Sequence, residues 1–118
     1  MANPNIYNAT SIVGDTITAA LTTTVTTALL TGITDKILKV NTIMISNVNG
    51  TSAASCTLSY YDGTNDRYFA YQITVPAGSS VVLIDRNSGF YIKEGNAIRG
   101  GASLNNYLTA LISYETIG

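Results

Sequence analysis

The chain has 118 residues, only 11% of them charged, and a formal net charge of −1 at neutral pH. This length suffices for one domain with its own core. Without a run of Lys or Arg, nucleic acid and acidic lipid are not attracted electrostatically, so we expect neither as a partner. The lack of histidine and the single cysteine exclude His-dependent catalysis, an internal disulfide and His-ligated or multi-cysteine metal sites.

The first residues, Met1–Asn5, contain neither a basic segment nor an apolar core. We therefore expect no signal peptide. The longest apolar runs are far shorter than a membrane-spanning helix requires. These features predict a chain made in the cytoplasm, with no membrane partner.

Residues 1–10 are predicted to form an extended N-terminal arm, and residues 11–118 a single domain. Pro4 favours an extended path, and the arm's only sizeable apolar side chains are Ile6 and Tyr7. Two alternatives remain open at this point. The arm is either a frayed terminus or a segment that packs on a neighbouring subunit.

Alternating apolar residues and threonines between Thr16 and Leu30 indicate β-structure, since a helix tolerates this threonine load poorly. We expect a turn at Gly14-Asp15 before this stretch and a break near Thr22–Thr23 within it. Ile37–Val48 is the most apolar strand, with large side chains on both parities. This pattern predicts either a central strand covered on both faces or a bulge near Asn41 that reverses the alternation.

The best-defined local feature is a hairpin of two strands, Cys56–Tyr61 and Arg67–Val75, around the turn Asp62–Asp66. The Asp-Gly pair in that turn favours a tight reversal. Alternation predicts a buried face on each strand. The predicted buried residues are Cys56, Leu58 and Tyr60 on the first strand, and Phe69, Tyr71, Ile73 and Val75 on the second.

Short apolar segments separated by turn residues continue to the end of the chain, and no segment has a convincing helical pattern. The predicted later strands are Ser80–Asp85, Phe90–Lys93 and Ala97–Arg99, after which Gly100-Gly101 weakens whatever follows. A last strand, with Leu108, Ala110, Ile112 and Tyr114 in alternation, is predicted to reach almost to the end of the chain. The total is eight or nine short strands, with turns at the spacing typical of a sandwich or a small barrel. We predict an all-β, single-domain antiparallel β-sandwich, jelly-roll-like or immunoglobulin-like.

Three segments carry a family resemblance: Val75–Asp85 with its Pro-Ala-Gly turn, Phe90–Ile98 with its Ile-Lys-Glu-Gly-Asn step, and Leu111–Glu115. Together with the hairpin they resemble small β-sandwich virion proteins of tailed bacteriophages, most closely those of cyanophages. The resemblance implies a virion location and a capsid decoration (cement) role, or a neck, tail or fibre role. It transfers no catalytic residue, and we expect no enzyme activity.

Two candidate chemical sites have simpler structural explanations. The loop Asp62–Asp66 offers oxygen ligands to calcium but lacks the full EF-hand series, and Asp and Asn are common in turns for backbone reasons. Cys56 lies on the predicted apolar face, where a free thiol behaves as a small hydrophobe. We therefore predict no metal site, no cofactor and no reactive cysteine.

The eight tyrosines are the remaining candidates for binding. Tyr60, Tyr71 and Tyr114 share parity with predicted core residues, whereas Tyr61, Tyr68 and Tyr91 have the opposite parity. Outward tyrosines suit both protein interfaces and sugar platforms. The predicted interaction surface combines them with the arm: Pro4, Ile6, Tyr7, Tyr61, Tyr68 and Tyr91.

The predicted function is that of a virion structural protein that associates with itself, as a homo-oligomer and by analogy a trimer, and with the major capsid protein or other virion proteins. The low surface charge suits close packing against other subunits. A carbohydrate-binding sandwich is the alternative supported by the same tyrosines.

Overall fold

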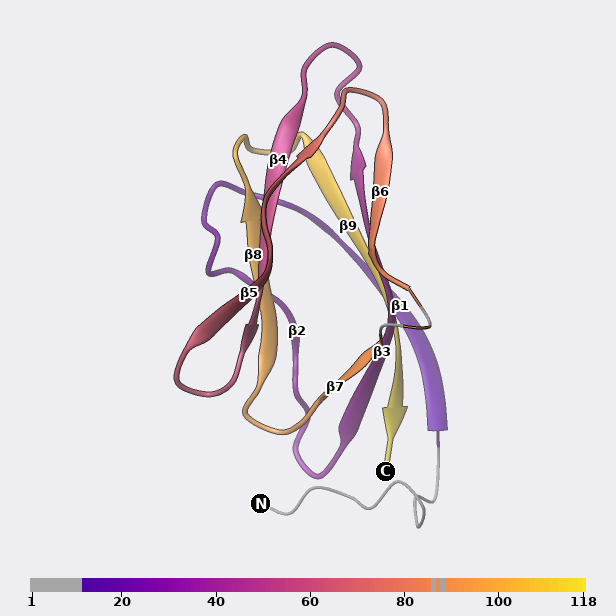
Figure 1. Cartoon of the computed structure of the whole chain (residues 1–118). Helices are drawn as coiled ribbons and strands as arrows, with labels where there is room; N and C mark the ends of the chain where they lie inside the picture. Colours follow the sequence, from indigo (N-terminus) through magenta and orange to yellow (C-terminus); the bar gives the residue numbers. More distant parts are fainter. Residues whose placement is uncertain (1–11, 86, 88) are drawn as a thin grey trace.

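The computed structural model describes residues 12–85, 87 and 89–118, and every regular element in that part of the chain is a β-strand (Figure 1). The strands are β1 (Ile12–Ala20), β2 (Ala28–Thr31), β3 (Ile37–Asn47), β4 (Ala54–Tyr61), β5 (Asp66–Val75), β6 (Ser80–Ile84), β7 (Phe90–Ile92), β8 (Ala97–Ala102) and β9 (Leu108–Ile117). The predicted all-β antiparallel sandwich is confirmed.

Two sheets pack face to face, and their strand orders define a jelly roll. One sheet, sheet A, has the order β1-β9-β3-β6, with β7 also paired to β3; the other, sheet B, has the order β2-β8-β4-β5. Because β6 and β7 pair with successive parts of β3, they act as one interrupted strand. The pairs β1–β9, β2–β8, β3–β6/β7 and β4–β5 are then those of one long hairpin rolled into two sheets, which is the jelly-roll rather than the immunoglobulin arrangement.

The core lies between the sheets and consists of aliphatic side chains from both. The largest fully buried ones are Leu21, Leu38, Val40, Ile43, Ile45, Leu58, Val75, Ile92, Ile98, Leu108 and Ile112, together with Cys56. Each fully buried Leu or Ile contributes about 1.5–3 kcal/mol relative to exposure. The predicted buried face of β4 is confirmed for Cys56 and Leu58, which are both 0% exposed.

A bulge at Asn41 explains the mixed pattern of β3. The register of β3 against β9 shifts between Val40 and Thr42. Buried residues fall on even positions before this point, as at Val40, and on odd positions after it, as at Ile43. The predicted register reversal is confirmed, and β3 also has the predicted central position in its sheet.

The predicted buried face of β5 is mostly wrong. Val75 is buried, but Phe69, Tyr71 and Ile73 are 36%, 62% and 37% exposed, and Ala70 is buried instead. The register between β4 and β5 shifts twice, and Gln72 adopts a positive φ of 50°. These irregularities break the period of two, and the edge position of β5 leaves one side of the strand uncovered.

Two predicted breaks are also wrong, and both lie inside strands. Gly14 and Asp15 continue the pairing of β1 with β9, opposite Glu115 and Tyr114. The predicted strand Ala97–Arg99 does not end at Arg99 but extends through Gly100 and Gly101 to Ala102. The predicted break near Thr22–Thr23 is confirmed, because β1 ends at Ala20 and β2 begins at Ala28.

Gly100 and Gly101 belong in β8 because neighbouring chain segments approach too closely for a side chain. A Cβ on Gly100 would collide with the Leu58 side chain and lie 2.8 Å from the Thr57 carbonyl oxygen. A Cβ on Gly101 would lie 2.6 Å from the carbonyl oxygen of Thr22. The glycines therefore let β8 contact both β4 and the segment that connects β1 to β2.

Candidate interaction surface

An apolar hollow of about 350 Å³ opens where the edges of the two sheets face each other. Its lining comes from β4 and β5 of one sheet, from β6 and β7 of the other, and consists of Tyr60, Phe69, Ile84, Phe90 and Tyr91. We call this the aromatic hollow. Four of the five side chains are aromatic, so the hollow offers flat apolar surface to a ligand or protein.

Edge-to-face contacts hold the rings of the aromatic hollow in place. The Phe90 ring lies between Tyr60 and Phe69, with centroid distances of 5.6 and 5.7 Å. Tyr60 donates its hydroxyl to the Tyr91 carbonyl oxygen at 2.8 Å and accepts a hydrogen bond from Asn96 Nδ2 at 3.0 Å. Since the polar end of Tyr60 is engaged, the ring presents its apolar part to the hollow.

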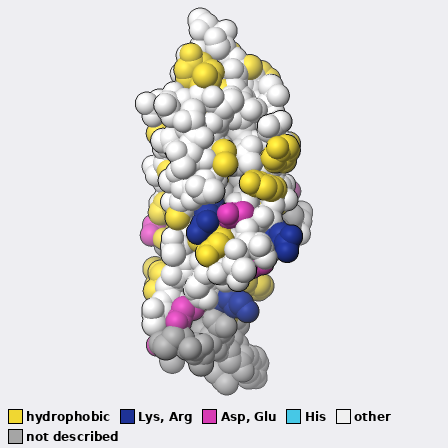
Figure 2. Space-filling view, turned by 90° about the vertical axis from the view of Figure 1, so that its left-hand side faces the viewer, with side chains coloured by type: hydrophobic (Ala, Val, Ile, Leu, Met, Phe, Trp, Pro, Cys, Tyr) yellow, Lys and Arg dark blue, Asp and Glu magenta, His cyan; other side chains and the backbone are white. Residues whose placement is uncertain are grey.

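Strand β5, which contributes Phe69 to the hollow, also carries two exposed tyrosines. The rings of Tyr68 and Tyr71 form an edge-to-face pair at 5.4 Å, and the two residues are 51% and 62% exposed. Figure 2 shows the side of the molecule that lies to the left in Figure 1, where separate exposed hydrophobic groups stand beside several charged side chains. Exposed tyrosines of this kind are common at protein interfaces.

Two of the predicted interaction tyrosines, Tyr68 and Tyr91, are half exposed, at 51% and 50%. They lie on strands of different sheets, β5 and β7, and Tyr91 lines the aromatic hollow. Tyr71 was assigned to the core by parity, which is wrong. Tyr114 is buried as predicted. Pro4, Ile6 and Tyr7, the arm part of the predicted surface, lie outside the described residues.

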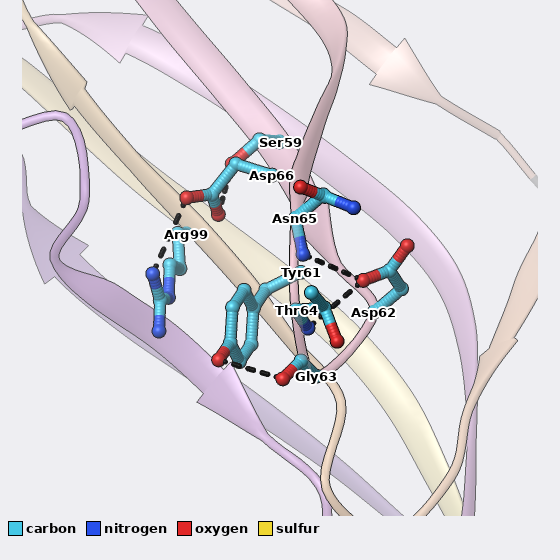
Figure 3. Close-up of polar contacts among 8 residues, drawn as sticks. All are labelled: Ser59, Tyr61, Asp62, Gly63, Thr64, Asn65, Asp66 and Arg99. Atoms are coloured by element: carbon cyan, nitrogen blue, oxygen red, sulfur yellow. Dashed lines mark hydrogen bonds and ion pairs between the residues drawn. The ribbon is translucent and has the colours of Figure 1, made fainter.

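Tyr61 lies under an arginine (Figure 3). The Arg99 guanidinium carbon is 3.6 Å from the centroid of the Tyr61 ring, and the Tyr61 hydroxyl donates to the Gly63 carbonyl oxygen at 3.0 Å. Arg99 also pairs with Asp66 at 3.3 Å, and Asp66 accepts a hydrogen bond from Ser59 at 3.2 Å. One face of the ring is thus covered within the chain by a cation–π contact.

The carboxylate of Asp62 stabilises the turn of the loop Asp62–Asp66. Asp62 Oδ1 accepts hydrogen bonds from the backbone N–H groups of Asn65 and Thr64, at 2.7 and 3.0 Å (Figure 3). These hydrogen bonds lower the pKa of Asp62, and the bond from Asn65 has the largest effect. Gly63 has a positive φ of 96°. Among the described residues no group of three or more Cys, Asp or Glu side chains is placed to hold a metal ion.

A second hollow, of about 470 Å³, is polar and lies across β1, β9 and β3. We call it the polar hollow. Its lining is Gly14, Asp15, Thr16, Lys39, Asn41, Thr42, Ser113, Tyr114 and Glu115. Asp15 accepts a hydrogen bond from the Tyr114 hydroxyl at 3.2 Å, and Glu115 accepts one from Asn41 Nδ2 at 3.3 Å. Burial, followed by this bond to Asp15, raises the pKa of Tyr114.

Cys56, the chain's only thiol, is fully buried. Burial raises its pKa to about 11. The thiolate is the reactive form of cysteine, so this group is chemically quiet near neutral pH.

Sequence reasoning missed the aromatic hollow as a unit. Phe90 and Ile84 were predicted as strand residues only, and Phe69 was predicted to be buried. The pairing of β5 with β4 is local and was predicted, but the approach of β5 toward β6 and β7 depends on the rolled topology. The exposed parity of Tyr91 was the one signal in the sequence that pointed toward this site.

No protein-family model matches the chain, and no curated protein matches it. Within the described residues, no helix is long and apolar enough to cross a membrane.

Proposed function

We propose that this chain is a non-enzymatic structural protein of a tailed-phage virion, and that it decorates the capsid. The observation that carries the proposal is the exposed aromatic surface formed by the aromatic hollow together with Tyr68 and Tyr71. The sequence resemblance to phage virion proteins supports the same role. The jelly roll agrees with it, since this fold occurs in capsid proteins, although it also occurs in lectins and by itself assigns no function.

In this proposal the aromatic hollow receives an apolar side chain of a neighbouring virion protein, in the first place the major capsid protein. Aromatic residues are enriched at the centres of protein interfaces, where charged residues are depleted. The hollow has this composition, since all five lining residues are apolar or aromatic. A neck, tail or fibre position would use the same surface and differs in the number of copies per particle.

Copy number in purified particles tests the proposal. Particles of the phage that encodes the chain are purified, and the chain is quantified against the major capsid protein by mass spectrometry with labelled peptides. Decoration requires a fixed ratio with many copies, whereas a neck or fibre position gives only a few. Absence of the chain from complete particles would overturn the virion proposal.

A matched pair of variants tests the surface itself. Tyr91→Asp places a charge at the aromatic hollow, and Val48→Asp places the same charge at a residue that is 65% exposed and does not line it. We expect Tyr91→Asp to reduce co-sedimentation with shells that lack the chain at least tenfold, and Val48→Asp to leave it unchanged. Equal binding by both variants would remove the hollow from the proposal.

Carbohydrate binding is the second candidate, and the polar hollow favours it. A sugar needs several hydrogen-bonding side chains, and Asp15, Asn41 and Glu115 supply them there. Glycan-array binding that is lost in Asn41→Ala and retained in Tyr91→Asp would favour this function. Absence of glycan binding would remove it.

A further inference from the structure

The two sheets have four edges, and β1 forms one edge of sheet A. It pairs with β9 over nine consecutive residues, from Ile12 opposite Ile117 to Ala20 opposite Thr109, without a register shift. No described strand pairs with its outer side. A regular strand of this length presents a row of backbone N–H and C=O groups to any strand that approaches it.

The other three edges carry irregularities that oppose pairing with another chain. β5 has two register shifts against β4 and a positive φ at Gln72. β6 has a register shift against β3 and is separated from β7 by the segment 85–89. β2 has only four residues and a register shift against β8. Bulges, interruptions and short edge strands are the devices by which folded proteins avoid edge-to-edge association.

The composition of β1 offers no comparable protection. The strand contains no Lys, Arg or Pro, and its single charged residue is Asp15. The Asp15 carboxylate already accepts hydrogen bonds from the Tyr114 hydroxyl and from the backbone N–H of Thr16. Seven of the nine residues are exposed, including Ile12 and Val13 at 58% each. Only Ile17, which packs against the core, and Ala19 are half-buried, so most of the strand is accessible to a partner.

We infer that β1 pairs antiparallel with β1 of a second copy of this chain, so that the two A sheets join into one continuous sheet. An antiparallel pair of identical strands is two-fold symmetric, which closes the contact at a dimer. With Thr16 opposite its own copy, Asp15 lies opposite Ile17, so the two carboxylates do not face each other directly. The net charge of −1 per chain adds little repulsion.

This contact goes beyond the proposed function and is independent of it. It uses the β1 edge and leaves the aromatic hollow, which lies between β5 and β7, free for a different partner. It is also two-fold, unlike the trimer that the analogy with decoration proteins suggests. Failure of the particle measurement would therefore leave this inference intact, and failure of the dimer would leave the virion proposal intact.

Light scattering on the full-length chain measures the predicted dimer. We expect a mass of twice the 12.4 kDa of one chain at micromolar concentration. Thr18→Lys adds a charge to the exposed β1 edge and should weaken the dimer at least tenfold. Thr74→Lys, the same change at an exposed position of the irregular β5 edge, should leave the mass unchanged. A monomeric wild-type chain at high micromolar concentration would overturn the inference.

Cysteine cross-linking locates the contact. Because Cys56 is 0% exposed, a cysteine introduced by Thr16→Cys is the reactive thiol of the folded chain. In the paired strands, two residues opposite each other lie within the Cα range of a disulfide. Mild oxidation should therefore give a covalent dimer from Thr16→Cys and none from the control Thr74→Cys. A dimer that resists Thr18→Lys and forms no β1 cross-link would place the contact elsewhere and overturn the inference.

Deletion of residues 1–9 tests whether the dimer depends on pairing of β1 strands or on the N-terminal arm of the second copy. We expect the shortened chain to keep the dimer mass and the Thr16→Cys cross-link. Loss of both, with the fold intact by circular dichroism, would show that the arm of the second copy, and not β1, occupies the edge.

Discussion

Tyr60 of β4 donates its hydroxyl to the carbonyl oxygen of Tyr91 on β7, at 2.8 Å. This hydrogen bond joins the two sheets beside the aromatic hollow. The same hydroxyl accepts a hydrogen bond from the Asn96 side chain. One side chain thus supports both the hollow and the inter-sheet contact beside it.

Tyr60→Phe should lower the free energy of unfolding by about 1 kcal/mol, because it removes a hydrogen bond donor while the ring contact with Phe90 remains. Urea denaturation measures the change. Tyr71→Phe removes the same hydroxyl from a ring that is 62% exposed, and should change the stability by less than about 0.5 kcal/mol. Equal losses in the two variants would show that the hydroxyl of Tyr60 has no special role.

Stability should fall as the pH rises from about 9 to about 11. The pKa of the buried Cys56 thiol is raised from 9.0 to about 11, so the unfolded chain loses this proton before the folded chain does. The favourable contribution of the neutral thiol is therefore complete below pH 9 and disappears as the pH passes through the folded value. The pKa of Tyr114 is also raised, mainly by burial, so its ionisation lowers the stability in the same direction as the pH rises.

Denaturation curves at several pH values measure this effect, and Cys56→Ala provides the control. The variant should show a weaker decline between pH 9 and 11 than the natural chain. An identical decline in both would show that Cys56 does not contribute to it. In addition, a thiol reagent such as DTNB should label native Cys56 much more slowly than the denatured chain.

Gly100→Ala should destabilise the fold by about 2 kcal/mol or prevent folding, because the added methyl group collides with Leu58 and approaches the Thr57 carbonyl oxygen to 2.8 Å. Gly14→Ala is the matched control on another strand, since its Cβ would meet nothing within 4 Å. This change should be neutral or slightly stabilising. Thermal unfolding of the two variants compares them directly, and a neutral Gly100→Ala would contradict the close approach of β8 and β4.

Asp62→Asn should weaken the hairpin turn selectively at neutral pH. The backbone N–H groups of Asn65 and Thr64 lower the pKa of the Asp62 carboxyl below its ordinary value of 3.8. The stabilising contribution of the charged form is therefore present above that value and is lost as the pH falls through the folded pKa. The difference in melting temperature between Asp62→Asn and the natural chain should shrink as the pH falls below 3.8.

The same loop provides a test of the prediction that no metal is required. Addition of EDTA or of millimolar calcium should leave the melting temperature of the natural chain unchanged, since a ligand that binds only the folded state would raise it. A rise with calcium that disappears in Asp62→Asn would establish a calcium site at this turn.

Sequence patterns predicted the features that depend on neighbours along the chain. The hairpin β4–β5, the reversal at Asn41 and the buried positions of Cys56 and Leu58 all follow from alternation and turn chemistry, and the structure confirms them. The prediction of a turn at Gly14-Asp15 was wrong because glycine and aspartate also occur in strands when a partner strand, here β9, supplies the pairing.

The candidate site was less predictable because it depends on contacts between distant segments. The alternation of Phe69, Tyr71 and Ile73 has the period of a buried face. The two register shifts of β5 and its place at the edge of the sheet determine the actual exposure. Neither property is visible in the strand's own sequence, and the contact of Phe69 with Phe90 depends on how the two sheets pack.

The rolled hairpin has a consequence for how this chain folds. Among the described strands that pair with each other, only β4 and β5 follow one another directly in the chain, and each further pair outward, from β3 with β6 to β1 with β9, encloses a longer loop. Closing larger loops costs more chain entropy, so topologies rich in distant pairings fold in milliseconds to seconds. We expect the β4–β5 hairpin to form first and β1 to pair with β9 last. The β1 edge is then the final part of the molecule to become ordered.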